Sequence, residues 1–289
     1  MTQAAEQIIY LPLNELHPFP HHPFKVQDDE QMQKTTESIR QQGVLVPGIV
    51  RPLAEGGYEI ISGHRRKRAC ELAGFETMPV IVRNLDDDAA ILVMVDTNLQ
   101  REHILPSERA FAYKMKLEAL RRQGKSIDLT SSQVGMKLQT LDLIGEKAGD
   151  SRNQVHRFIR LTYLIPPLLQ MVDDKKIKFN PAVELSYLMP GEQEQIIAAL
   201  EQAQTSPSLS QAQRLKKLSQ EGRLTREAMD EIFAEVKKPP LDQSFLHNPK
   251  IRKYFPKSYS DEKVADVILR LVESWHKQQV KKRQQQQGR

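Results

Sequence analysis

The sequence predicts an α+β N-terminal domain over residues 1–106, an all-helical domain over 107–236 and a helical C-terminal segment over 241–289. Strand and helix signals alternate along the first hundred residues, which is typical of a domain that mixes both elements. After Leu105-Pro106-Ser107 the strand signals largely stop, and short segments of helical spacing continue. Lys237-Lys238-Pro239-Pro240 is typical of a linker and separates the last segment.

Local patterns place each element of the N-terminal domain. Short apolar or β-branched runs predict strands at residues 8–11, 44–50, 58–61 and 79–82. Apolar residues at helical spacing predict helices over residues 28–43, 63–74 and 86–97. Acidic residues open the first of these helices and Gly43 follows its end, as the helix dipole and the left-handed C-terminal conformation favour. Gly56-Gly57 predicts a tight turn between two strands.

The later part of the chain consists of predicted helices. Glycine and proline interrupt the helical spacing at Gly124, Gly149, Pro166-Pro167, Pro181, Pro190-Gly191, Pro207 and Gly222. A last helix is predicted from Asp261 to about Lys282, with an apolar stripe of Val264, Val267, Ile268, Leu271, Val272 and Trp275. The stripe has two candidate partners, the helical domain or the same helix of a second copy. The tail from Lys281 to Arg289 is Gln-rich and basic, which predicts disorder.

Composition excludes several classes of protein. Apolar residues make up 39% and charged residues 27% of the 289 residues, as in soluble globular proteins. We find no signal-peptide pattern and no apolar run of roughly 18 residues, so we expect a cytoplasmic protein without a membrane partner. The single cysteine, Cys70, excludes an internal disulfide and a Cys-rich zinc module.

Charge is unevenly distributed along the chain. Residues 1–106 carry 10 Lys and Arg against 15 Asp and Glu, whereas residues 107–289 carry 32 against 22. Concentrated basic charge favours a polyanionic partner such as nucleic acid. A set of solvated helical faces is the alternative explanation.

Two polar clusters in the N-terminal domain predict a phosphate site. Gly63 stands where a strand ends and a helix begins, and the unpaired N–H groups of a helix N-terminus attract anions. Arg65, Arg66 and Arg68 follow, and arginine matches phosphate oxygens bidentately. A second cluster, Asn98-Leu99-Gln100-Arg101-Glu102, follows an apolar helix. The alternatives are exposed basic residues on an amphipathic helix and simple capping of a helix C-terminus.

A helix-turn-helix pattern lies at residues 140–163. Leu141, Ile144, Gly145 and Ala148 share one helical face, and Gly149-Asp150 predicts the turn. Ser151 is expected to cap the second helix, with Gln154 completing a capping box. The N-terminal residues of the second helix reach base edges in such motifs, so the pattern predicts a DNA reader. An ordinary helical hairpin with a basic face is the alternative.

The second helix of this pattern supplies the candidate DNA-binding residues. They are Ser151, Arg152, Asn153, Gln154, His156, Arg157 and Arg160. Arginine prefers guanine edges and Asn or Gln prefers adenine, so Arg152, Asn153 and Gln154 are the candidate base readers. Arg157 and Arg160 are expected to contact phosphates.

The order of these motifs resembles the ParB/Spo0J-type partition proteins over roughly residues 8–190. Val46–Arg51 is similar to that family's "QPIVVR", and Gly57–Ala69 is similar to "GYELIAGERRxRA". Asn98–Glu102, with Leu105-Pro106 and Glu108, is similar to "ENxQRxxLxPxE", and a helix-turn-helix follows. The resemblance implies a ParB/sulfiredoxin-like α+β domain followed by an all-α helix-turn-helix domain.

The resemblance also implies a nucleotide site. In that family the N-terminal domain binds CTP with Mg²⁺, and the cofactor-binding residues carried over by position are Gly63, His64, Arg65, Arg66, Asn98 and Arg101. His64 and Thr97 stand where the family has glutamates, and each change removes a carboxylate suited to a hard cation or to orienting a water. We therefore expect nucleotide binding with little or no CTP hydrolysis, and we assign no catalytic residue.

The leading hypothesis is a sequence-specific DNA-binding protein for plasmid or chromosome partition, associated with the nucleoid or a plasmid. It would bind a palindromic, centromere-like duplex as a homodimer. By resemblance, CTP would switch it to a sliding clamp, and a ParA-type ATPase would be its partner. A transcription regulator of a mobile element with a degenerate nucleotide domain is the first alternative. An enzyme that hydrolyses nucleotides is the second, and the missing carboxylates argue against it.

Overall fold

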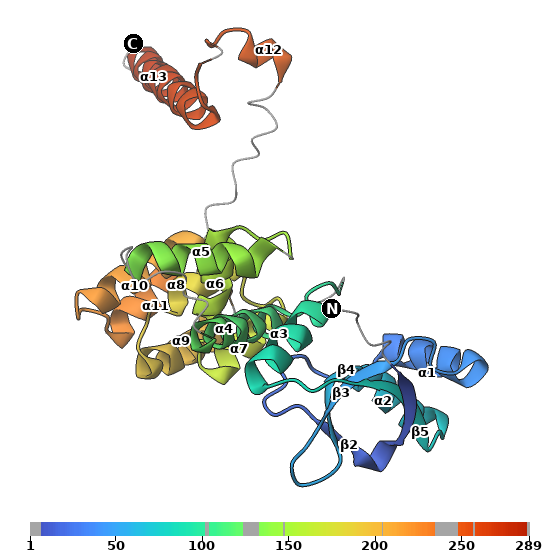
Figure 1. Ribbon diagram of the computed structural model, residues 1–289. Coiled ribbons are helices and arrows are strands. Elements are labelled where there is room, and N and C mark those ends of the chain that lie inside the picture. The colour runs from blue at the N-terminus through green and yellow to red at the C-terminus, as the bar shows by residue number, and fades with distance from the viewer. Residues whose placement is uncertain are drawn as a thin grey trace. The chain divides into compact units, whose positions relative to one another are not determined.

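The computed structural model describes residues 7–101, 104–123, 133–146, 148–203, 205–234, 248–256 and 258–287. The chain divides into two units, Met1–Ala234 and Glu235–Arg289. The first unit contains the sheet and the helices up to α11 (Figure 1). Glu102 and Gly124, which the sequence patterns included, lie outside the described residues.

Within the described residues, five strands form one mixed sheet in the order β1-β5-β3-β4-β2. They are β1 (Ile8–Pro12), β2 (Leu16–Pro18), β3 (Gly48–Pro52), β4 (Tyr58–Ser62) and β5 (Thr77–Val82). The β1–β5 and β3–β4 pairs are antiparallel, whereas the β3–β5 and β2–β4 pairs are parallel. A 3₁₀ turn, Leu13–Glu15, links β1 to β2.

The sheet differs from the sequence prediction in two places. The strand expected over residues 44–50 begins only at Gly48. Pro47 cannot donate a ladder hydrogen bond, and the carbonyl groups of Val46 and Pro47 accept hydrogen bonds from Arg66 instead. The short strand β2 was not expected, because three residues are too few to show an alternating pattern.

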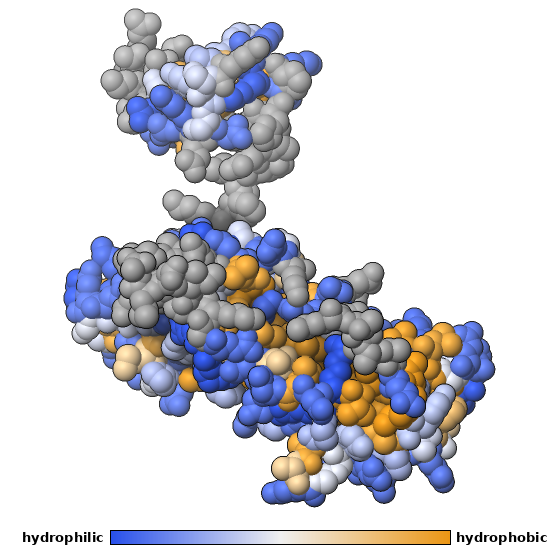
Figure 2. Space-filling model, in the orientation of Figure 1, coloured by the Kyte–Doolittle hydropathy of each residue, from blue (hydrophilic) through white to orange (hydrophobic). Residues whose placement is uncertain are grey.

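Two helices cover one face of the sheet. α1 (Glu30–Gln42) and α2 (His64–Ala73) contribute buried Met32, Ile39 and Cys70 to a core that includes Val50 and Val80 of the strands. Cys70 is a buried free cysteine. On β1, alternate residues point to the opposite face, where Ile8 and Tyr10 are exposed. Figure 2 shows apolar residues gathered on the surface over the sheet.

A second core runs from the sheet into the helical region. It begins at Ile61 of β4, passes α3 (Asp87–Asn98) and continues through the later helices. These are α4 (Pro106–Arg122), α5 (Gln133–Glu146), α6 (Arg152–Leu161), α7 (Pro166–Asp173), α8 (Phe179–Leu185), α9 (Pro190–Ala203), α10 (Leu209–Gln220) and α11 (Arg226–Ala234). α4 packs against α3, α5, α6 and α7. The predicted fold class, an α+β region followed by an all-helical one, is confirmed.

The second unit contains α12 (Pro249–Arg252) and α13 (Asp261–Gln287). The predicted last helix is present and continues to Gln287, beyond its expected end near Lys282. Lys, Arg and Gln are good helix formers, which favours this extension. Val264 is buried, whereas Leu271 and Trp275 of the apolar stripe are about 60% exposed. No helix within the described ranges is long and apolar enough to cross a membrane.

Candidate functional site

The turn between β4 and α2 depends on Gly63. Its φ of 118° lies in the region that favours glycine. A Cβ there would lie 3.3 Å from the Cα of Gly48 and 3.2 Å from the methyl carbon of Met78. The strand can therefore turn into α2 at this point only with glycine, and the next three residues are directed to different surroundings.

His64, the first of these, is buried against a second histidine. Its Nε2 accepts a hydrogen bond from the backbone N–H of Phe19 at 3.3 Å, and its ring centroid lies 3.9 Å from that of His22. The Nδ1–H of His22 donates to the carbonyl of Phe24 at 2.7 Å. Burial lowers the pKa of His64 to about 3 and that of His22 to about 4. Both rings are therefore neutral at pH 7.

Arg66 and Asn98 are engaged in structural contacts. The guanidinium of Arg66 donates to the carbonyl oxygens of Val46 and Pro47 at 2.5 and 2.6 Å. The buried amide of Asn98 donates to the carbonyl of Met94 at 2.7 Å, within its own helix. These two predicted cofactor residues hold the loop before β3 and the end of α3, and neither lines the cavity that Arg65 and Arg101 line.

That cavity has a volume of about 860 Å³. Arg65 forms an ion pair with Asp29 at 2.9 Å, and the guanidinium of Arg101 lies over the ring of Phe24 at 5.5 Å. Burial, together with the positive charges of Arg65 and Arg66, lowers the pKa of Arg101. Mutually repelling guanidinium groups in one cavity favour an anionic ligand. The described lining residues are Lys25, Gln27, Asp29, Gln31, Arg65, Arg101, Ile104, Leu105, Pro106, Glu108, Asp173 and Lys175.

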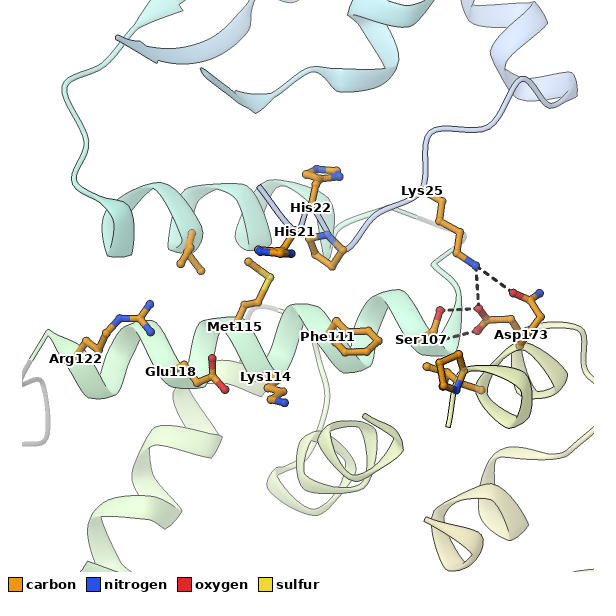
Figure 3. Close-up of a pocket in the computed structure, with 15 residues that line it drawn as sticks. His21, His22, Lys25, Ser107, Phe111, Lys114, Met115, Glu118, Arg122 and Asp173 are labelled. Carbon is orange, nitrogen blue, oxygen red and sulfur yellow. Dashed lines mark hydrogen bonds and ion pairs between the residues drawn. The ribbon is translucent and has the colours of Figure 1, made fainter. Parts of the chain in front are cut away.

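Buried carboxylates tie this cavity to the helical region. Glu108, in the first turn of α4, accepts hydrogen bonds from the backbone N–H groups of Lys25 at 2.7 Å and Leu105 at 3.0 Å. Asp173 accepts from the backbone N–H of Ser107 at 3.0 Å and from its hydroxyl at 2.5 Å. The ammonium group of Lys25 lies 3.5 Å from the same carboxylate (Figure 3).

A second cavity of about 680 Å³ shares Lys25 and Asp173 with the first. Figure 3 shows it between the loop carrying His21 and His22 and the face of α4 that carries Phe111 and Met115. Sequence reasoning missed Asp173 and Lys175 as cavity residues. No local pattern marks them, because α7 reaches the cavity only through tertiary packing.

The residues of the predicted helix-turn-helix pattern fall in α5, α6 and the turn that joins them. The carbonyl of Gly145 accepts hydrogen bonds from the N–H groups of Ala148 at 3.0 Å and Asp150 at 3.1 Å, and Gly149 has a φ of 69°. The Asp150 carboxylate accepts from the hydroxyl of Tyr113 at 2.5 Å and pairs with Arg109 at 3.1 Å. Two residues of α4 therefore hold the turn through their contacts with Asp150.

The expected DNA-binding residues fall into two groups. Ser151 caps α6 by accepting from the N–H of Gln154, and Asn153 and His156 are exposed. The basic residues are held by neighbouring side chains: Arg152 pairs with Asp142, and Arg157 donates to the Asn180 amide oxygen at 2.6 Å. Arg160 donates to the hydroxyl and carbonyl oxygens of Ser186, and its guanidinium lies over the rings of Tyr163 and Tyr187.

Comparisons with known proteins identify the family of this chain. Residues 1–99 match the ParB N-terminal domain. Over 193 residues, the chain is 31% identical to the chromosome-partitioning protein Spo0J of Thermus thermophilus, which corresponds to 67% of this chain and 65% of that protein. The chain belongs to the ParB/Spo0J-type family.

Two further proteins are similar to this chain. The chain is 35% identical to stage 0 sporulation protein J of Bacillus subtilis over 169 residues, or 58% of this chain and 54% of that protein. It thus spans less than two thirds of the length of these relatives. A solved structure of truncated Caulobacter crescentus ParB complexed to the parS site is 24% identical, with a TM-score of 0.43, over 72% of this chain and 98% of that one.

Proposed function

We propose that this ParB-type chain is a DNA-binding partition protein whose N-terminal domain binds CTP. The observation that carries the proposal is the α5–α6 pair, whose turn is built on Gly145 and Gly149 and supported by α4. A pair of this kind places its second helix in the major groove. The proposal assigns nucleotide binding to residues 1–106 and DNA reading to residues 107–236.

The first turn of α6 supplies the base contacts in this proposal. Asn153 is exposed there, and its amide is suited to the edge of adenine. Arg152 reads a base after exchanging its contact with Asp142 for one with DNA. Arg157 and Arg160 are already fixed by neighbouring side chains, so they lose little conformational freedom when they contact phosphates. Ser151, Gln154 and His156 complete the surface.

In this proposal, CTP places its phosphates in the cavity lined by Arg65 and Arg101. The motif similarity around both residues and the mutual repulsion of their charges support this placement. Gly63, His64, Arg66 and Asn98 do not line the cavity and instead fix the backbone of the segments that carry Arg65 and Arg101. The homodimer, the CTP-driven sliding clamp and a ParA-type partner are further parts of the same proposal.

DNA reading is tested by selecting duplexes from a random pool with purified protein. An inverted repeat is expected among the selected sequences, because a dimer presents two copies of α6. Asn153→Ala is expected to weaken binding to the selected duplex about 10- to 100-fold. Lys217→Ala is the control, because the Lys217 side chain on α10 is exposed. Enrichment of no sequence would contradict the proposal.

Nucleotide binding is tested by calorimetry with CTP and ATP on the full chain. CTP-selective binding that is lost in Arg101→Ala supports the proposal. A second function, a transcription regulator without a nucleotide, is favoured by the neutral, buried state of His64. Sequence-specific DNA binding with no bound nucleotide would select that function instead.

A further inference from the structure

We infer that the cavity lined by Arg65 and Arg101 binds nucleotide phosphates through its cationic side chains, without a divalent metal ion. This inference rests on the proposed nucleotide function and names how the same site handles charge. It follows from the state of the carboxylates around the cavity, which are already engaged by the protein.

Each carboxylate among the described lining residues has partners. Asp29 accepts from the backbone N–H of Met32 at 2.8 Å and pairs with Arg65 at 2.9 Å. Glu108 and Asp173 each accept a backbone N–H bond in the first turn of α4 or just before it, as described above. Moving Glu108 or Asp173, which are both buried, onto a metal would leave buried donors unsatisfied, at a cost of about 1–3 kcal/mol for each donor.

The two positions where the family has glutamates do not fit Mg²⁺ either. Magnesium is usually held by one or two carboxylates together with the substrate phosphates. The Nε2 of His64 is occupied by the N–H of Phe19, and the ring is neutral and buried. The hydroxyl of Thr97 is within hydrogen-bond distance of the Val93 and Met94 carbonyls of its own helix.

The described side chains also contain no cage for a metal ion held by protein groups alone. Within those ranges, no group of three His, Cys, Asp or Glu side chains is placed to hold a metal ion. His64 and Thr97, at the two positions where the family has glutamates, therefore supply no carboxylate to Mg²⁺ in this chain.

The cavity instead offers cationic groups. Lys25, Arg65, Arg101 and Lys175 all line it. Burial lowers the pKa of Arg101, and the positive charges of Arg65 and Arg66 lower it further. A polyphosphate would relieve that repulsion, and guanidinium forks match phosphate oxygens bidentately at any pH. Lys25 and Arg65 exchange their ion pairs with Asp173 and Asp29 for contacts with phosphate, and the four cations then provide the neutralisation that a metal provides elsewhere.

Asp29 is the competitor for this anion site. Its carboxylate holds Arg65, so phosphate must displace it from the guanidinium. Asparagine at this position keeps the N-cap of α1, because Asn and Asp cap equally well, while it removes the competing charge. Asp29→Asn is therefore expected to tighten CTP binding about fivefold. If Asp29 were a metal ligand, the same change would weaken binding.

The experiment is isothermal calorimetry of the full chain with CTP in about 5 mM Mg²⁺ and, separately, in excess EDTA, at about 0.15 M salt. We expect the two dissociation constants to agree within about threefold. Asp29→Asn should tighten both. Glu37→Gln, the same kind of change at an exposed site of α1, should leave both unchanged.

Each result has one reading. Binding of CTP that is lost in EDTA, or weakened by Asp29→Asn, overturns the inference and leaves the proposed nucleotide function standing. The absence of CTP binding in both buffers overturns the proposed nucleotide function and this inference with it. Metal-independent binding that is tightened by Asp29→Asn establishes the inference.

Discussion

Replacing Gly145 by alanine tests the account of the turn between α5 and α6. A Cβ at this position would overlap the carbonyl oxygen of Asp150 and lie 3.0 Å from a methyl group of Val155. Because the oxygen belongs to the backbone, no side-chain rotation relieves the contact. The turn must open, and the hydrogen bond from the N–H of Asp150 to Gly145 is then lost or lengthened.

The magnitude follows from three terms. Overpacking of this kind costs about 1–3 kcal/mol, and the lost hydrogen bond costs about 1 kcal/mol. Alanine recovers about 1 kcal/mol of helix propensity within α5. The net loss is therefore about 2 kcal/mol in the free energy of unfolding.

Urea unfolding of the full chain, followed by the helical circular dichroism signal, measures this loss. For a slope of about 2 kcal/mol per molar urea, the midpoint should fall by about 1 M. Gly191→Ala is the control, because Gly191 lies in α9 without a positive φ and a Cβ added there would meet nothing within 4 Å. That change should stabilise by about 0.5–1 kcal/mol. A Gly145→Ala variant as stable as the wild type would refute the reasoning.

Three further predictions concern other parts of the chain. Tyr113→Phe removes the hydroxyl that donates to Asp150 and should lower the free energy of unfolding in urea by about 1.5–3 kcal/mol. An unchanged free energy of unfolding would contradict a stabilising role for this hydrogen bond. His22 and His64 have pKa values of about 4 and 3 in the folded protein, below the value of 6.5 in the unfolded chain. Their contribution to the free energy of unfolding is therefore complete above pH 6.5 and is lost as the pH falls toward 4. Thermal melts of His64→Gln should show a smaller decrease in melting temperature over that pH range. Trp275→Asp places a charge on the exposed stripe of α13 and should reduce the mass by light scattering if that stripe joins two chains; an unchanged mass would exclude this role.

The fold was largely predictable because its elements carry local signals. Gly63 and Gly74 bound α2 as expected, and Ser151 begins α6 by capping it. The late start of β3 could not be predicted, because it depends on Arg66, which lies 20 residues later and binds the preceding loop.

The candidate site was predictable only in part, for the same physical reason. Arg65 and Arg101 lie at the cavity as the motifs indicated, since each is close in sequence to a helix end. The engagement of Arg66 with backbone carbonyls, and the arrival of Asp173 from α7, result from tertiary packing. A pattern of residue types does not specify which of several adjacent arginines turns toward a cavity.

α4 gives the two candidate sites a common rigid element. Glu108 lines the same cavity as Arg65 and Arg101, and the next residue, Arg109, pairs with Asp150 in the turn before α6. A displacement of this helix by one ligand therefore alters the free energy of the other ligand's complex. Thermodynamic linkage then makes the effect mutual: any factor by which DNA changes the affinity for nucleotide is the factor by which nucleotide changes the affinity for DNA.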